Sequence, residues 1–164
     1  KTSTSRTRWS RTLLDIVAHN GAEPCFDETN TTKILGELIM RNAIRDRIIE
    51  EVEDFGARVY EPYMPDANTE KPYAVIVMGG EAETNMRYGF DVPVRVWVYV
   101  DKTSFSDVDS LLAKVINALN GVELEADDLK FGLRYTGSTD DTYDETWKAL
   151  TRQANFVTET IRGG

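Results

Sequence analysis

The side chains that most often carry out catalysis are scarce in this sequence. His19 is the only histidine and Cys25 the only cysteine, and they stand six positions apart. A nucleophilic pair needs a base within hydrogen-bond reach and a third group that orients the base. No such group stands beside them, and one thiol forms neither an internal disulfide nor a zinc site. We interpret His19 as the end of a short helix and Cys25 as a half-buried free thiol.

An acidic stretch near the C-terminus is the next candidate for chemistry. It contains Asp140, Asp141, Asp144 and Glu145. Carboxylates are the ligands that divalent cations prefer, and paired carboxylates can serve an acid-based hydrolase. However, the spacing differs from that of a calcium-binding loop, and no glycine stands at the position of the sharp turn. The pattern therefore favours a solvated loop, with hydrolysis as a remote alternative.

Gly79 and Gly80 follow an apolar run, as glycines do in phosphate-binding loops. Neither the expected third glycine nor a following Lys-Ser or Lys-Thr pair is present. A turn that ends a strand explains the two glycines better. With no recognisable active site, the sequence predicts a protein that is not an enzyme and that uses no cofactor.

The charge balance also excludes several classes of function. The chain has 164 residues, of which 41% are hydrophobic and 29% charged, and its formal net charge is −9. This composition is typical of one folded domain. A protein that grips nucleic acid needs clustered lysine and arginine, which a net charge of −9 disfavours. An acidic wall that surrounds DNA without holding it stays compatible with the sequence. No apolar run is long enough to span a membrane.

Three segments show helical spacing of apolar residues, namely 9–19, 32–54 and 106–120. Residues 1–8, which are polar and basic, are predicted to be disordered. For the helix 32–54, Thr31 or Thr32 is the expected N-cap. For the helix 106–120 it is Ser106. The apolar stripe of the helix 32–54 is expected to contain Leu35, Leu38, Ile44, Ile48, Ile49, Val52 and Phe55.

Five segments are predicted to be strands: 57–60, 73–78, 91–101, 131–137 and 147–158. The third alternates cleanly, with valines at every second position from Val92 to Val100. Such an all-valine face belongs against a core, whereas Trp97 and Tyr99 share the opposite face. The segment 73–78 is almost continuously apolar, which indicates burial on both sides. Residues 138–145 are expected to form a loop.

The order of these elements predicts an α+β fold. We expect a mostly antiparallel sheet of about five strands, with two main helices packed on one face. Residues 1–30 would form an extension that is partly disordered and carries the short N-terminal helix. Residues 31–160 would form a single domain.

Aromatic residues are concentrated in the predicted strands and their connections. Aromatic platforms that stack on single-stranded bases are interleaved with lysine and arginine, which this region largely lacks. Core packing and contacts between protein subunits are the better interpretation, because tyrosine and tryptophan are enriched at interfaces. The residues concerned are Tyr60, Tyr63, Tyr73, Tyr88, Phe90, Trp97 and Tyr99.

Four segments in sequence order carry a resemblance to a known family. They are the helix RNAIRDRIIEEV at 41–52, the stretch RVYEPYMPDAN at 58–68 that leads into PYAVIVMGG at 72–80, the strand DVPVRVWVYV at 91–100, and the helix DVDSLLAKVINALNG at 107–121. In this layout the chain resembles the tail-terminator and head-tail joining (neck) proteins of siphophages. The resemblance covers about half of the chain, and the first 30 residues depart from it.

The resemblance implies a structural role in a virion. Subunits of this family form a homohexameric ring at the head-proximal end of the tail, assembled in the host cytoplasm. The ring terminates the tail tube and joins it to the head-tail connector, or stopper, protein. Double-stranded DNA would pass through the lumen without specific binding, and no cofactor is implied.

Two sets of residues follow as candidate contacts in such an assembly. We expect a hairpin over residues 80–90 and the aromatic strand face to touch a neighbouring subunit or the tube. The residues concerned are Glu81, Glu83, Thr84, Asn85, Met86, Arg87, Tyr88, Trp97 and Tyr99. The basic tail, with Lys1, Arg6, Arg8 and Arg11, is expected to dock on an acidic neighbour. The alternative from another class is a monomeric or dimeric adaptor that binds a single protein partner through the aromatic face.

Overall fold

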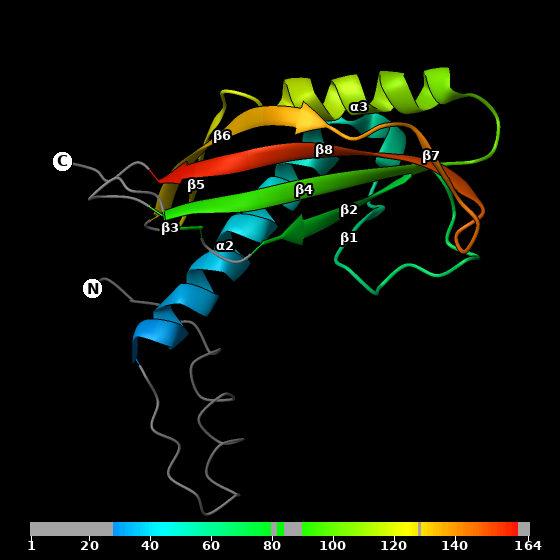
Figure 1. Cartoon of the computed structure of the whole chain (residues 1–164). Helices are drawn as coiled ribbons and strands as arrows, with labels where there is room; N and C mark the ends of the chain where they lie inside the picture. The colour runs from blue at the N-terminus through cyan, green and yellow to red at the C-terminus, as the bar shows by residue number, and fades with distance from the viewer. Residues whose placement is uncertain (1–27, 80–81, 84–89, 128, 161–164) are drawn as a thin grey trace, which may run out of the picture. The chain divides into compact units, whose positions relative to one another are not determined.

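A computed structural model describes residues 28–79, 82–83, 90–127 and 129–160 (Figure 1). The chain divides into two compact units, Lys1–Thr32 and Lys33–Gly164. In the first unit only the backbone of residues 28–32 is described. The predicted helix 9–19 lies outside the described residues.

The helices are α2 (Glu28–Glu51), the 3₁₀ turn η1 (Glu53–Phe55) and α3 (Phe105–Leu119). The structure therefore has the two main helices that the sequence predicts. In the part of the chain that is described, no helix combines the length and the apolar character needed to cross a membrane.

Helix α2 begins earlier than predicted, at Glu28 rather than near Thr31 or Thr32. Its buried residues lie four positions apart, at Met40, Ile44, Ile48 and Val52. At about 100° of rotation per residue this spacing keeps them on one stripe, and Phe55 of η1 continues the buried surface.

The prediction that Leu35 and Leu38 belong to this stripe was wrong. Their exposed fractions are 55% and 45%. Leu38 precedes Met40 by two positions, which places it on nearly the opposite side of the helix. Leu38 and Ile44 are six positions apart, which is about 240° of rotation around the helix. The predicted stripe therefore joined residues that lie on different sides of α2.

Helix α3 follows its predicted pattern except at its start. Its apolar stripe is buried, from Val108 to Leu119. The N-cap is Ser104, whose hydroxyl accepts a hydrogen bond of 3.1 Å from the backbone N–H of Ser106. Ser106, the predicted cap, lies inside the first turn. The helix ends at Leu119 with Asn120 as its C-cap, and Gly121 follows with a φ of +72°, which suits glycine.

In the described residues eight strands form the sheet. They are β1 (Val59–Tyr60), β2 (Tyr73–Met78), β3 (Ala82–Glu83), β4 (Phe90–Val100), β5 (Glu123–Ala126), β6 (Leu129–Ser138), β7 (Thr142–Asp144) and β8 (Ala149–Thr160). Six follow the order β1-β2-β4-β8-β6-β5, while β3 pairs with β4 and β7 with β8. Only β1 and β2 run parallel among the described pairs.

The predicted fold class is confirmed in its outline. The described fold is α+β with a mostly antiparallel sheet, and β2 has the predicted bounds. The strand number was too low because β3, β5 and β7 were not predicted. Residues 142–144, expected in a loop, instead form β7 against the start of β8.

The core lies between the helices and one face of the sheet. The valines of β4 from Val92 to Val100 are all buried, as predicted, and they form one cluster with the apolar stripes of α2 and α3. Phe131 and Phe156 from β6 and β8 complete it. Both helices therefore cover the same face, and in the described part of the chain no helix covers the opposite face of β2, β4 and β8 (Figure 1).

Candidate interaction surfaces

The uncovered side of the sheet, here called the outer sheet face, is poor in charge. It is formed by alternate residues of β2, β4 and β8 that pair across the strands. They are Tyr73, Val75 and Val77; Pro93, Arg95, Trp97 and Tyr99; and Thr151, Gln153, Asn155 and Val157. Four of these side chains, Tyr73, Val75, Thr151 and Gln153, are already buried within the chain. The accessible part of the face therefore consists of exposed Arg95 and of six partly buried residues, among them Trp97 and Tyr99. Arg95 is the one charged side chain among these described positions, in a chain in which 29% of residues are charged. Depletion of charge and enrichment in aromatic residues are typical of the centre of protein interfaces.

A line of aromatic rings crosses one end of this face. The rings of Tyr73 and Tyr99 are stacked, with centroids 4.8 Å apart. Tyr60 packs edge-on against Tyr73 at 5.9 Å, and Trp97 lies 6.4 Å from Tyr99. Offset and edge-on ring pairs stabilise a fold by more than the burial of their apolar surface alone. The line runs from Tyr60 on the edge strand β1, across β2, to Trp97 on β4. Its packed rings hold these three strands together at this end of the sheet.

Two tyrosines in this line, Tyr73 and Tyr99, have raised pKa values. Burial raises the pKa of Tyr73 far above its usual range, and nearby Tyr99 and Asp144 act in the same direction. Burial also raises the pKa of Tyr99.

Only some of the residues predicted to form an interface lie in the described part of the chain. Trp97 and Tyr99 share the outer sheet face, and both are partly buried. Strand β3 pairs with β4 at Glu83 and Phe90, so the chain does form the base of a hairpin there. Glu81, the tip from Thr84 to Tyr88, and the basic residues Lys1, Arg6, Arg8 and Arg11 lie outside the described residues. The side chain of Glu83 does too.

The loop between β1 and β2 exposes two apolar side chains, of which the sequence indicated Tyr63 as a residue for core packing or subunit contacts and gave no role to Met64. Tyr63 and Met64 are 101% and 66% exposed. Arg58 holds the base of this loop by donating to the carbonyl oxygen of Pro72 at 3.0 Å and to Glu70 at 3.2 Å. A fixed loop that exposes a tyrosine and a methionine is a second candidate contact surface. The two prolines that flank this pair, Pro62 and Pro65, were the available signal.

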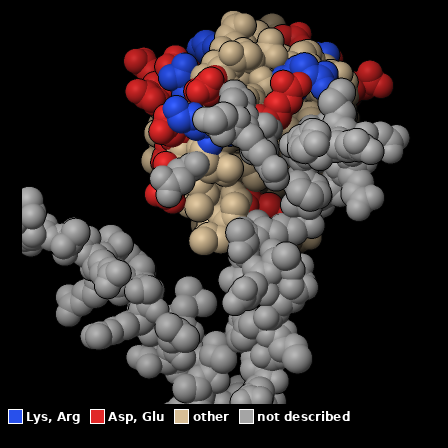
Figure 2. Space-filling model, turned by 90° about the vertical axis from the view of Figure 1, so that its left-hand side faces the viewer, with Lys and Arg blue, Asp and Glu red and all other residues tan. Residues whose placement is uncertain are grey.

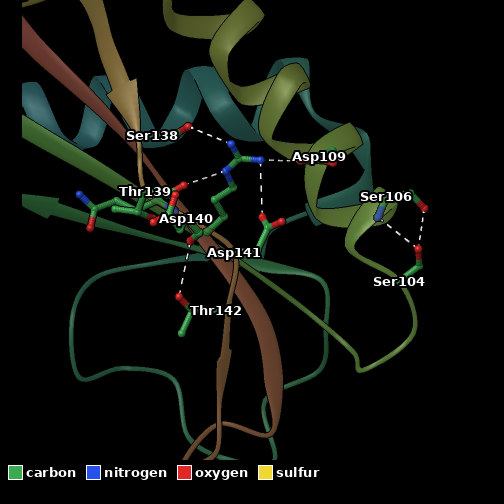
Figure 3. Close-up of polar contacts among 10 residues, drawn as sticks. Ser104, Ser106, Asp109, Ser138, Thr139, Asp140, Asp141 and Thr142 are labelled. Atoms are coloured by element: carbon green, nitrogen blue, oxygen red, sulfur yellow. Dashed lines mark hydrogen bonds and ion pairs between the residues drawn. The ribbon is translucent and has the colours of Figure 1, made fainter.

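The acidic stretch near the C-terminus is part of a structural network around Arg152 (Figure 3). From β8, Arg152 donates to Asp109 of α3 at 2.6 Å and pairs with Asp141 at 3.5 Å. It also donates to the hydroxyl of Ser138 at 3.2 Å and to the carbonyl oxygen of Thr139 at 2.9 Å. One guanidinium therefore joins α3, β8 and the connection from β6 to β7.

Replacing Arg152 with methionine is expected to lower the free energy of unfolding by about 1–2 kcal/mol, because Asp109 and Asp141 lose their cation. Both carboxylates are more than a third exposed and regain water, which keeps the loss at the lower end of the range for charged groups. Urea unfolding measures it. The matched control is Arg134→Met, which removes the exposed pair with Glu159 and should cost at most about 0.5 kcal/mol. Equal losses in the two variants would contradict the network.

The remaining acids of this stretch do not form a metal site. Asp144 accepts hydrogen bonds from the backbone N–H groups of Thr146 and Trp147, at 2.9 and 3.1 Å, which fixes a turn. Among the described residues, no group of three or more His, Cys, Asp or Glu side chains is arranged to hold a metal ion. Gly79 likewise has a structural role, since its N–H donates to the carbonyl oxygen of Pro93 at 2.7 Å.

Charges of both signs are interspersed over the described part of another face, seen in Figure 2. Ion pairs also join β5, β6 and β8: Lys130 pairs with Glu125 at 3.1 Å, and Arg134 with Glu159 at 2.8 Å. Exposed pairs of this kind contribute little to stability. This surface therefore differs from the outer sheet face in its content of charged side chains: it carries many, whereas Arg95 is the one charged residue among the positions named for the outer sheet face.

Comparison with known proteins identifies the fold. No family model matches the sequence, and no curated protein matches it. Among solved structures, a chain of the virion of a native gene transfer agent particle is similar, with a TM-score of 0.54 and 17% identity. The match covers 73% of this chain and 96% of that one. A second solved structure has a TM-score of 0.55 at 11% identity and covers 80% of this chain and 97% of that one. The chain therefore shares its fold with both structures over nearly the whole length of each.

Proposed function

We propose that this chain is a non-enzymatic structural protein of a virion, and that it forms a ring at the head-proximal end of a phage tail. There it terminates the tail tube and joins it to the head connector. The observation that carries the proposal is the fold shared with a chain of a gene transfer agent virion over 96% of that chain. The segments at 41–52, 58–80, 91–100 and 107–121, which resemble tail terminators, support the finer assignment.

In this proposal the ring is a homohexamer built through heterologous contacts, in which one surface of a subunit fits a different surface of the next. The outer sheet face, centred on Trp97 and Tyr99, and the hairpin that begins at β3 provide one of the two surfaces. Its low charge and its aromatic residues suit a contact that is fully desolvated. The exposed loop with Tyr63 and Met64 is available to the other.

The remaining partners follow from position in the tail. The ring contacts the tail tube protein on one side and the connector, or stopper, protein on the other, and it assembles in the host cytoplasm. Double-stranded DNA passes through the lumen. The net charge of −9 supports passage without retention, because phosphate is repelled rather than bound.

An adaptor is the second candidate function. The outer sheet face could bind a single protein partner as a monomer or dimer, and the same charge depletion favours such a contact. The two functions differ in self-association: the ring needs copies of the chain to bind one another, and the adaptor does not.

Electron microscopy of the purified chain tests the proposal. The expected particles are rings with six-fold symmetry and an open lumen. Particles of monomer or dimer size at every concentration would instead favour the adaptor. A preparation with added double-stranded DNA should show empty lumens, since an acidic chain does not recruit DNA in solution.

A further inference from the structure

A groove lies between helix α2 and the edge strand β5, with a volume of about 390 Å³. Its apolar lining comes from both elements: Ile39 and Ala43 on α2, and Leu124 and Ala126 on β5. A groove with apolar walls at a sheet edge is suited to an extended segment that carries at least one large apolar side chain.

The polar lining of this groove is mostly acidic. Asp46 and Glu50 come from α2, and Glu125 and Asp127 from β5 and the turn after it. Arg47, the one cation in the lining, pairs with Glu51 at 2.7 Å and more loosely with Glu50 at 3.9 Å. Lys130, next to the lining, pairs with Glu125 at 3.1 Å. Four carboxylates thus face two cations. The groove therefore keeps a negative balance that a basic segment would neutralise.

The first eleven residues of the chain have the complementary composition. They contain Lys1, Arg6, Arg8 and Arg11, no acidic residue, and Trp9 among the arginines. We propose that residues 1–11 of one copy dock in the α2–β5 groove of a neighbouring copy, with Trp9 against the apolar lining and the arginines against the acidic rim. This inference rests on the proposed ring, because only an assembly brings a neighbour's groove within reach.

In a closed ring the tail of every copy can occupy the groove of its neighbour. Each copy offers one tail and one groove, so a closed ring lets every tail occupy a groove, whereas an isolated pair leaves one of each unfilled if the contact is heterologous. The contact is electrostatic at its rim. Salt therefore weakens it, and it weakens more steeply than the charge-poor contact of the outer sheet face.

Photo-crosslinking in the full chain tests the docking. Trp9 is replaced by the photoreactive residue p-benzoylphenylalanine, and equal amounts of ¹⁴N-labelled and ¹⁵N-labelled protein are mixed before assembly and irradiated. Mass spectrometry then locates the crosslinks. The expected crosslinks fall in residues 39–50 and 124–127 and join peptides of different isotopic label.

A charge reversal in the groove gives the matched comparison. Asp46 and Glu50 are exposed and one helical turn apart, so Asp46→Lys with Glu50→Lys changes the rim without touching the core. Reversing the two charges is expected to lower the crosslink yield by about tenfold. The control, Asp140→Lys with Glu145→Lys, makes the same change in charge in the exposed connection before β8 and should leave the yield unchanged.

The outcomes separate this inference from the proposed function. A hexameric mass with crosslinks outside the groove would overturn the docking and leave the ring standing. Crosslinks in the groove that join only peptides of the same label would place the tail on its own copy and contradict the exchange between neighbours. A monomeric mass with same-label crosslinks would overturn both.

Discussion

Replacing Trp97 with glutamate is expected to leave the chain folded and to prevent it from forming its ring. Trp97 lies on the outer sheet face, opposite the valines of β4, so the substitution leaves the core intact. A buried tryptophan at the centre of an interface commonly contributes 2 kcal/mol or more, and a desolvated carboxylate adds a further cost. A loss of that size corresponds to about thirtyfold weaker association at each contact. Light scattering should then give the mass of a monomer where the original chain gives a hexamer.

The control for this variant carries the same added charge at a different place. Asn117 is exposed on α3, on the side of the molecule where the helices lie, and Asn117→Glu should leave the hexamer intact. Circular dichroism of both variants checks that the fold survives. A Trp97→Glu chain that keeps its native mass would show that the outer sheet face is not the subunit contact.

Replacing Phe131 with alanine is expected to lower the free energy of unfolding by about 3–5 kcal/mol. Phe131 is fully buried, between the sheet and the helices, and its removal leaves a cavity that the surrounding side chains fill only partly. For a domain of this size such a loss is a large share of the total stability. Urea unfolding, followed by the fluorescence of the tryptophans, measures it.

The same substitution at an exposed phenylalanine is the matched control. Phe105 begins α3 and is 38% exposed, so Phe105→Ala removes less buried surface and should cost about 1 kcal/mol or less. Losses of equal size at the two positions would mean that Phe131 does not belong to the core. Because ring formation also stabilises the folded chain, both variants are compared at one protein concentration.

The elements with a strong side-chain period could be predicted from the sequence. In β4, valines alternate with polar and aromatic residues, and this pattern fixed both the strand and the face that is buried. The stripe of α3 did the same for its helix. The uncovered aromatic face followed from the same alternation, since whatever lies opposite the valines of β4 must face away from the core.

Short edge strands could not be predicted, because they depend on backbone pairing more than on side-chain pattern. β5 consists of Glu-Leu-Glu-Ala and β7 of Thr-Tyr-Asp, and each is too short to show a period. Their positions are set by the strands beside them: β5 pairs with β6, and β7 pairs with β8 at residues that β6 does not reach.

Contacts between distant parts of the sequence were also beyond prediction. Arg152 and Asp109 are 43 positions apart, and neither stands in a local motif that indicates the pair. The α2–β5 groove joins residues near 46 and 125 for the same reason. The acidic residues were visible in the sequence, but only the fold separates those that neutralise an arginine of their own chain from those that line a groove.

The mass of the purified full chain in solution, measured by light scattering over a range of concentrations, tests the central claim most directly. A self-assembling tail ring predicts a six-fold multiple of the 18.5 kDa subunit, stable on dilution into the micromolar range. A mass of one or two subunits at every concentration would contradict the ring and favour an adaptor that binds another protein through its outer sheet face.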